Sequence, residues 1–146
     1  MKRPLRSFTL VVLQFTLLSG LVLSAPWSAL GALRLLLIAA SLLLVCWAIL
    51  AMGGRTFSVF PEPRPGARLI VGGPYRWVRH PMYLAVLLAA AAAGSAPPIG
   101  LHSAFAALLL PVIVIKVRVE ERAMAAAFPE RGDRMRGIAR LVPGLW

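Results

Sequence analysis

Long runs without a charged residue constrain the fold of this chain more than any other feature. They cover residues 7–25, 35–52 and 81–115. A transmembrane helix needs roughly 20 apolar residues, so the third run is too long for one helix and accommodates two short ones. A turn at Pro97-Pro98 fits this division because proline interrupts helices. The sequence therefore predicts four spans, at about residues 7–25, 35–52, 81–96 and 99–117.

Composition places the chain among integral membrane proteins. Hydrophobic residues make up 60% of it and charged residues 14%, and its mean hydropathy is +0.81. Soluble domains are nearer half apolar and a quarter charged. We therefore expect one all-α membrane domain over residues 1–146. The net charge of +11 does not predict nucleic-acid binding, because no soluble recognition platform accompanies it. The net positive charge instead fits arginines that flank membrane spans and contact anionic lipid headgroups.

The distribution of charge predicts the topology. Basic residues gather at the N-terminus, in the loop 53–80 and in the segment 118–146, whereas the loop after the first span holds only Arg34. By the positive-inside rule, both termini and the basic loop face the cytoplasm. The first run resembles a signal peptide, but a proline after Ser24-Ala25 makes a poor cleavage site, so we expect a retained span. The alanine-, arginine- and leucine-rich composition suggests a bacterial inner membrane. The apolar tail, residues 141–146, is expected in the membrane interface.

Two polar clusters interrupt this apolar chain. The first, residues 72–83, reads GGPYRWVRHPMY, and the second, residues 116–121, reads KVRVEE. If the third and fourth spans form a hairpin, one cluster enters it and the other leaves it on the same side of the membrane. The sequence therefore predicts that the clusters meet in a cytoplasmic pocket at the open end of the hairpin.

The residue types in these clusters leave two interpretations of the glutamates. Glu120 and Glu121 lie where a helix leaves lipid, and a carboxylate there is costly unless it is paired or ligated. They either form ion pairs with Arg79 or Arg118, or bind a cationic amine.

The other end of the predicted pocket favours an anion. His80 precedes Pro81, a favoured first residue of a helix, and free N–H groups at a helix N-terminus attract negative charge. An amino-acid headgroup carries both charges. Tyr75, Trp77 and Tyr83 either present aromatic faces to a flat ring or a sulfonium, or belong to an interfacial aromatic belt.

The residues that carry this chemistry also carry a resemblance. Residues 73–83 closely resemble the GPYxxxRHPxY signature of the isoprenylcysteine carboxyl methyltransferase family. That family also includes phospholipid N-methyltransferases and small-thiol methyltransferases. Glu120 and Glu121, followed by Met124 and Phe128, look like its closing EExxL…FG pattern. The resemblance covers roughly residues 50–143. It implies methyl transfer from S-adenosylmethionine in a cytoplasm-facing pocket capped by the loop and the tail.

Carried over residue by residue, the resemblance implies a set of site residues. Glu120 corresponds to the residue that takes the cofactor's amino group. Lys116 stands where isoprenylcysteine enzymes have an arginine near the substrate carboxylate, and lysine keeps the charge without the bidentate fork. The resemblance implies no metal site. The candidate catalytic residues are Arg79, His80 and Lys116, and the candidate cofactor residues are Leu69, Ile70, Tyr75, His80, Pro81, Met82, Tyr83, Glu120 and Glu121.

Departures in the tail affect what the resemblance predicts. Pro129, Gly132 and Met135 stand where the family has a glycine and two tyrosines. We therefore expect a different lid and acceptor pocket but a similar cofactor site. The acceptor, a small or lipidic molecule entering from the bilayer, remains open among a prenylated cysteine, a phospholipid amine, a small thiol and an isoprenoid acid. A non-catalytic member of the family is the main alternative. A four-helix transporter is disfavoured because no ionisable residue lies mid-span.

Overall fold

The computed structural model describes residues 4–28, 30–144 and 146, and within these ranges the chain forms helices and no strand. The elements are α1 (Leu5–Ser24), α2 (Ala32–Thr56), the short 3-10 helix η1 (Gly73–Arg76), α3 (Pro81–Gly94), α4 (Leu101–Ala127) and α5 (Arg131–Arg134). Three of the helices, α1, α2 and α4, are long and apolar enough to cross a membrane. The fourth, α3, has 14 apolar residues, about 21 Å of helix. The all-α membrane fold predicted from the sequence is confirmed.

Helix boundaries follow local signals in the sequence. Proline starts α3, because its fixed backbone angle suits the first helical turn and its missing N–H costs nothing there. Near the end of α2, Gly53 has a φ of 65°, which breaks the regular helix before the polar loop begins. The helix α4 continues well past its apolar part and ends at Ala127, two residues before Pro129.

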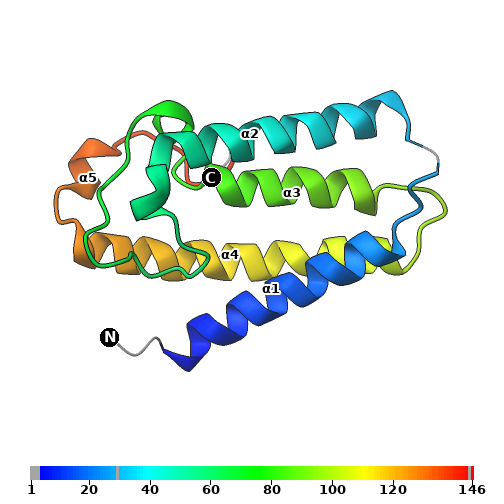
Figure 1. Ribbon diagram of the computed structural model, residues 1–146, viewed down its shortest axis with the longest axis horizontal. Helices are drawn as coiled ribbons and strands as arrows, with labels where there is room; N and C mark the ends of the chain where they lie inside the picture. Colours follow the sequence, from blue (N-terminus) through cyan, green and yellow to red (C-terminus); the bar gives the residue numbers. More distant parts are fainter. Residues whose placement is uncertain (1–3, 29, 145) are drawn as a thin grey trace.

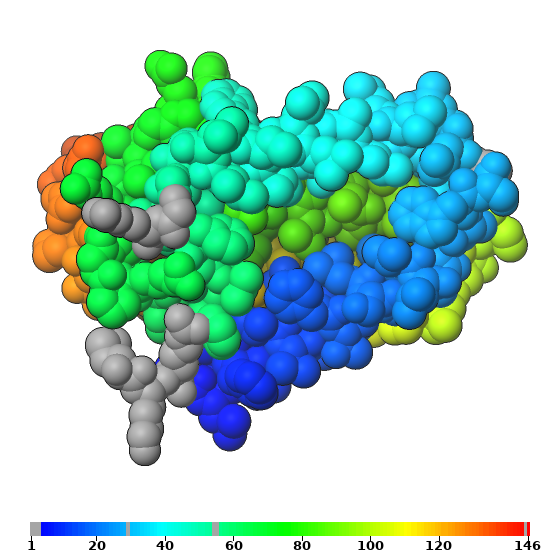
Figure 2. Space-filling model, viewed as in Figure 1, coloured from blue at the N-terminus to red at the C-terminus, as the bar shows by residue number. Residues whose placement is uncertain are grey.

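The four long helices lie side by side in the order α2, α3, α4, α1 (Figure 1). Close contacts at small residues bring α4 against its two neighbours. A Cβ atom on Gly94 would lie 2.4 Å from the Ala106 Cβ, and one on Gly20 would lie 2.6 Å from the Phe105 ring. By contrast, α1 and α2 hardly touch in the described chain. The surface of α3 is visible between them in Figure 2.

One end of this bundle gathers the polar segments. There α1 and α3 begin, α2 and α4 end, and the loop between α2 and η1 covers the helix ends (Figure 1). The tail joins them by main-chain hydrogen bonds: Arg79 N–H donates to Ala139 O at 2.8 Å, and His80 N–H donates to Arg140 O at 3.1 Å. The tail is therefore fixed to the first polar cluster at the residues that precede α3.

The apolar tail packs on the base of the α3–α4 hairpin, and its place in the membrane interface stays a prediction. Leu141 is 2% exposed and packs with Ile113 and Val117 of α4. Trp146 packs against the same cluster. Burial of these side chains removes apolar surface from water and anchors the tail to the base of the α3–α4 hairpin.

Candidate active site

The backbone of the first polar cluster directs Tyr75 inward. Gly73 has a φ of 58°, and a Cβ there would lie 2.8 Å from the Ala51 Cβ of α2. This close approach lets η1 sit against α2 and buries Tyr75, which is 9% exposed. Two residues later the chain turns outward, and Trp77 is 64% exposed. Tyr75 therefore reaches the site, whereas Trp77 faces the surroundings of the protein.

The two polar clusters meet, as the hairpin prediction requires. His80 Nε2 lies 2.6 Å from Glu121 Oε1. The Tyr83 hydroxyl donates to Glu120 Oε2 at 2.8 Å. Arg79 Nη1 donates to Glu121 Oε2 at 3.1 Å. Residues about forty positions apart in sequence thus form one site at the open end of the hairpin.

Arginines pair with Glu121 but not with Glu120. The Glu121 carboxylate accepts hydrogen bonds from Arg79, His80 and both terminal nitrogens of Arg131. This carboxylate therefore ties α4 to the motif and to the tail. Arg118, the other arginine proposed as a partner, is exposed. Glu120 has no arginine or lysine within ion-pair distance in the described chain; its neighbours are His80 Nδ1, at 3.5 Å, and the Tyr83 hydroxyl, at 2.8 Å.

The protonation states of the buried groups follow from this arrangement. Burial alone would lower the pKa of His80, but hydrogen bonds and the charges of Glu120 and Glu121 outweigh it and raise the pKa above its ordinary value. His80 is therefore a cation held between two carboxylates. Burial, and after it the charge of Glu120, raises the pKa of Tyr75, so its phenol stays protonated.

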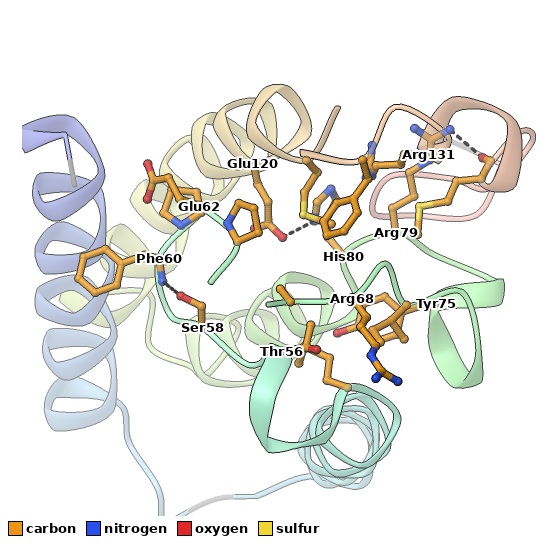
Figure 3. Close-up of a pocket in the computed structure, with 18 residues that line it drawn as sticks. Thr56, Ser58, Phe60, Glu62, Arg68, Tyr75, Arg79, His80, Glu120 and Arg131 are labelled. Carbon is orange, nitrogen blue, oxygen red and sulfur yellow. Dashed lines mark hydrogen bonds and ion pairs between the residues drawn. The ribbon is translucent and has the colours of Figure 1, made fainter. Parts of the chain in front are cut away.

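The first of two neighbouring pockets lies under the loop and the tail (Figure 3). Its cavity volume is about 80 Å³. In Figure 3, Glu120 and His80 lie on one side of it, and Thr56 and Tyr75 on the other. Its polar lining residues are Thr56, Ser58, Glu62, Arg68, Tyr75, Arg79, His80, Glu120 and Arg131.

The second pocket lies among the helices and is lined mainly by apolar side chains. Its cavity volume is about 250 Å³. Helix α1 contributes Gln14, Phe15 and Leu18, and α3 contributes Met82, Tyr83 and Val86. Phe15 is 48% exposed on the outer surface of α1, so this pocket reaches the face of the bundle that meets lipid.

Six residues line both pockets and form the wall between them. They are Met52, Ser58, Tyr75, Arg79, His80 and Glu120. Molecules held in the two pockets would therefore meet at Glu120 and at the rings of Tyr75 and His80.

Lys116 adds a positive charge to the second pocket that the first pocket does not share. Its side chain is 1% exposed, and its Nζ donates to Gln14 Oε1 at 2.5 Å and to Val59 O at 3.2 Å. The Nζ also lies 5.3 Å from the centre of the Tyr83 ring. Lys116 lines only the second pocket.

Comparison with known proteins agrees with this site. The model of the isoprenylcysteine carboxyl methyltransferase (ICMT) family matches residues 32–126, more than half of the chain. The chain belongs to this family. The match and the apolar helices together make it an integral membrane protein of a methyltransferase family. No curated protein and no solved structure is detectably similar to it.

The structure divides the sequence-predicted ICMT site residues between the pockets. Ile70 lines the first pocket, and Pro81, Met82, Tyr83 and Lys116 line the second. Residues of the shared wall, Tyr75, Arg79, His80 and Glu120, line both. Leu69 is 9% exposed in the core and lines neither. Glu121 also lines neither pocket, because its ion pairs hold it behind the wall.

Sequence reasoning missed the parts of the site that lie outside the two clusters. From α1, which the family model does not match, Gln14 reaches the second pocket. Its signal was available, since Gln14 is a lone amide within an apolar run. The loop adds Ser58, Phe60 and Glu62 to the first pocket, and no pattern marked them.

Glu62 joins the loop to α1. One of its carboxylate oxygens accepts a hydrogen bond from the Ser7 hydroxyl. The other oxygen is buried and has no partner among the described residues. In Figure 3 the Glu62 side chain points toward α1. It therefore fastens the loop over the first pocket.

The altered tail shapes the first pocket. Phe128, Arg131 and Met135 line that pocket and do not line the second. Met135, at a position where the family has tyrosine, is 2% exposed. We expected the tail departures to change the acceptor pocket; of the three departures only Met135 lines a pocket, and it is the pocket beneath the loop.

Proposed function

We propose that this ICMT-family protein is an S-adenosylmethionine-dependent methyltransferase that methylates the carboxylate of a membrane amphiphile, of the isoprenylcysteine type. Family membership supports methyl transfer. The observation that carries the fuller proposal is the wall shared by the polar and the apolar pocket. A water-soluble donor and a lipid-soluble acceptor need separate approaches and one meeting point, and this arrangement provides both.

The lining of the first pocket suits S-adenosylmethionine. Its cavity of about 80 Å³ is smaller than the roughly 300–1,000 Å³ of small-molecule sites, so binding requires the loop and the tail above it to move outward. Glu120, with no arginine or lysine partner in the described chain, offers a carboxylate to an ammonium group. Phe60, Tyr75 and Phe128 offer aromatic surface. When bound, the cofactor supplies an electrophilic methyl group on a positively charged sulfur.

The protein's own groups suit an acceptor that needs no base. His80 is protonated and bonded to glutamates, so its ring nitrogens do not accept a proton. Tyr75 stays neutral. A carboxylate is already a nucleophile, whereas an ammonium group must first lose a proton. Catalysis here rests on positioning and on the exclusion of water by the loop and the tail.

Lys116 supports a carboxylate as the acceptor. An ammonium group on the wall of an apolar pocket favours an anionic group at that depth. Gln14 orients Lys116 by accepting one of its hydrogen bonds. Phe15 and Leu18 leave the apolar part of the acceptor in contact with the lipid-facing side of the bundle. We infer that the amphiphile enters from the bilayer between α1 and α2.

The orientation in the membrane is part of the proposal. The end of the bundle that holds the pockets carries exposed arginines, and basic residues are retained on the cytoplasmic side. We propose a bacterial inner-membrane protein whose termini and pockets face the cytoplasm, where anionic lipid headgroups meet the arginines. Among the described residues, the exposed arginines at this end are Arg6, Arg64, Arg68, Arg76, Arg118, Arg122, Arg134, Arg136 and Arg140.

Transfer of a labelled methyl group tests the proposal. Detergent-purified protein is incubated with methyl-labelled S-adenosylmethionine and S-farnesyl-N-acetylcysteine. We expect alkali-labile label in the lipid phase, since a methyl ester releases methanol in base. The methyl ester of the same acceptor is the control and should take up no label. Alkali-stable label on an ethanolamine phospholipid or on a thiol, with none on the acid, would overturn the carboxylate assignment.

A further inference from the structure

One polar atom beside the first pocket is left unused by the described protein. The Nε of Arg131 is buried and has no hydrogen-bond partner within the described ranges. The side chain of Arg131 lines the first pocket, and the residue is only 5% exposed. A buried donor without a partner is unfavourable, so such an atom in a pocket indicates an acceptor that arrives with a ligand.

The position of this guanidinium is fixed. Its two terminal nitrogens both donate to the carboxylate of Glu121. Glu121 is held in turn by Arg79 and His80. Arg131 therefore keeps a defined orientation at the pocket, and its Nε–H is one of the donors that these two hydrogen bonds leave unused.

The charges around Arg131 favour an anion. Arg79, Arg131 and Arg140 lie within 4 Å of the single carboxylate of Glu121. The protonated His80 adds a further positive charge. These four positive groups outnumber the two carboxylates beside them, those of Glu120 and Glu121.

Glu120 lies next to this positive group. The guanidinium of Arg131 reaches back to Glu121, the residue adjacent to Glu120 in α4. Glu120 and Arg131 both line the first pocket. The first pocket thus presents a carboxylate for an ammonium group and a guanidinium for a carboxylate group, the two charges that an α-amino acid requires.

We propose that Arg131 binds the α-carboxylate of the cofactor's amino-acid end, with Glu120 on the ammonium group. This inference rests on the proposed function. It places the amino-acid end toward α5 and the tail, which lie outside the region matched by the family model. The nucleoside end then lies toward Phe60 and Thr56 on the loop side of the pocket (Figure 3).

Truncated ligands test this assignment by binding rather than by activity. We would titrate S-adenosylhomocysteine and 5′-methylthioadenosine, which lacks the amino-acid end, into detergent-purified protein by calorimetry. Hydrogen bonds to charged groups predict that Arg131→Gln weakens S-adenosylhomocysteine binding by about 10- to 100-fold. Binding of 5′-methylthioadenosine should change less than about twofold, because the group in contact with Arg131 is missing. The matched control is Arg134→Gln, an exposed arginine of the same short helix, which should leave both affinities unchanged.

Parallel weakening of both ligands in Arg131→Gln would assign Arg131 a structural role and overturn the proposal, as would no change in either. A second measurement on the unaltered protein is independent of any folding defect. Decarboxylated S-adenosylhomocysteine should bind at least about tenfold more weakly than the intact molecule. Equal binding contradicts the role of Arg131 while the proposed function stands. If the unaltered protein binds none of these nucleosides, the proposed function itself fails.

Discussion

Replacement of Lys116 by methionine tests the division of labour between the two pockets. Methionine has a similar length and no charge, so it keeps much of the packing of a side chain that is 1% exposed. The variant loses the charged donor that lines the second pocket. It leaves the first pocket unchanged, because Lys116 does not line it.

The size of the effect follows from the bond that is lost. A hydrogen bond to a charged group contributes about 1.5–3 kcal/mol, which is roughly 10- to 150-fold in affinity. We therefore expect Lys116→Met to raise the KM for S-farnesyl-N-acetylcysteine by that factor. The affinity for S-adenosylhomocysteine should stay within about twofold, since Lys116 does not line the first pocket. Initial rates with labelled cofactor and calorimetric titration measure the two quantities.

Two controls separate recognition from stability. Arg118→Met removes an exposed charge two residues further along α4 and should change neither quantity. Lys116→Met also leaves Gln14 Oε1 and Val59 O without their donor, which costs about 1–3 kcal/mol of folding free energy. The double variant Gln14→Leu/Lys116→Met removes both the Lys116 donor and the Gln14 acceptor and leaves only Val59 O without a partner. It should recover thermal stability but not acceptor binding. If Lys116→Met weakened cofactor binding as much as acceptor binding, the separation of the two pockets would be wrong.

Three further predictions concern the scaffold of the site. Gly73→Ala should lower Tm more than Gly66→Ala, because both have positive φ but only Gly73 has a neighbour, 2.8 Å from the added Cβ; equal losses would mean that the approach of η1 to α2 is unimportant. His80 has a folded-state pKa above its unfolded value, so its contribution to stability is complete below about pH 6.5 and is lost as pH rises through the raised pKa. Tm should therefore fall over that pH range in the natural protein and fall less in His80→Asn. Identical pH profiles of Tm would contradict the ion pairs of His80 with Glu120 and Glu121. Met135→Tyr should weaken S-adenosylhomocysteine binding more than it raises the acceptor KM, since Met135 lines the first pocket and not the second. A larger effect on the acceptor KM would mean that the tail shapes the acceptor pocket.

The helical fold and the meeting of the two clusters were predictable because both follow from one-dimensional patterns. Charge-free runs delimit membrane helices, and Pro97-Pro98 within the longest run implies a hairpin. A hairpin brings its two ends together whatever the side chains are. His80 and Glu121 were therefore expected to be neighbours, and they lie 2.6 Å apart.

The parts of the site that were not predicted depend on how separate elements pack. Gln14 reaches Lys116 only because α1 packs on α4 rather than on α2, and no sequence pattern specifies that neighbour. Arg131 looked like one of several surface arginines, yet its side chain folds back onto Glu121. Leu141 looked like part of an interfacial anchor, and main-chain bonds from the motif instead draw the tail into the core.

The most direct test of the account is calorimetric binding of S-adenosylmethionine to detergent-purified protein, with Glu120→Gln as the comparison. Glu120 lines both pockets and is half-buried without an arginine or lysine partner in the described chain, so its replacement leaves the Glu121 ion pairs intact. The account predicts saturable binding in the natural protein and a loss of about tenfold or more in the variant. Equal affinity in both would remove Glu120 from the cofactor site. No binding at millimolar cofactor, in protein shown to be folded, would contradict the methyltransferase assignment.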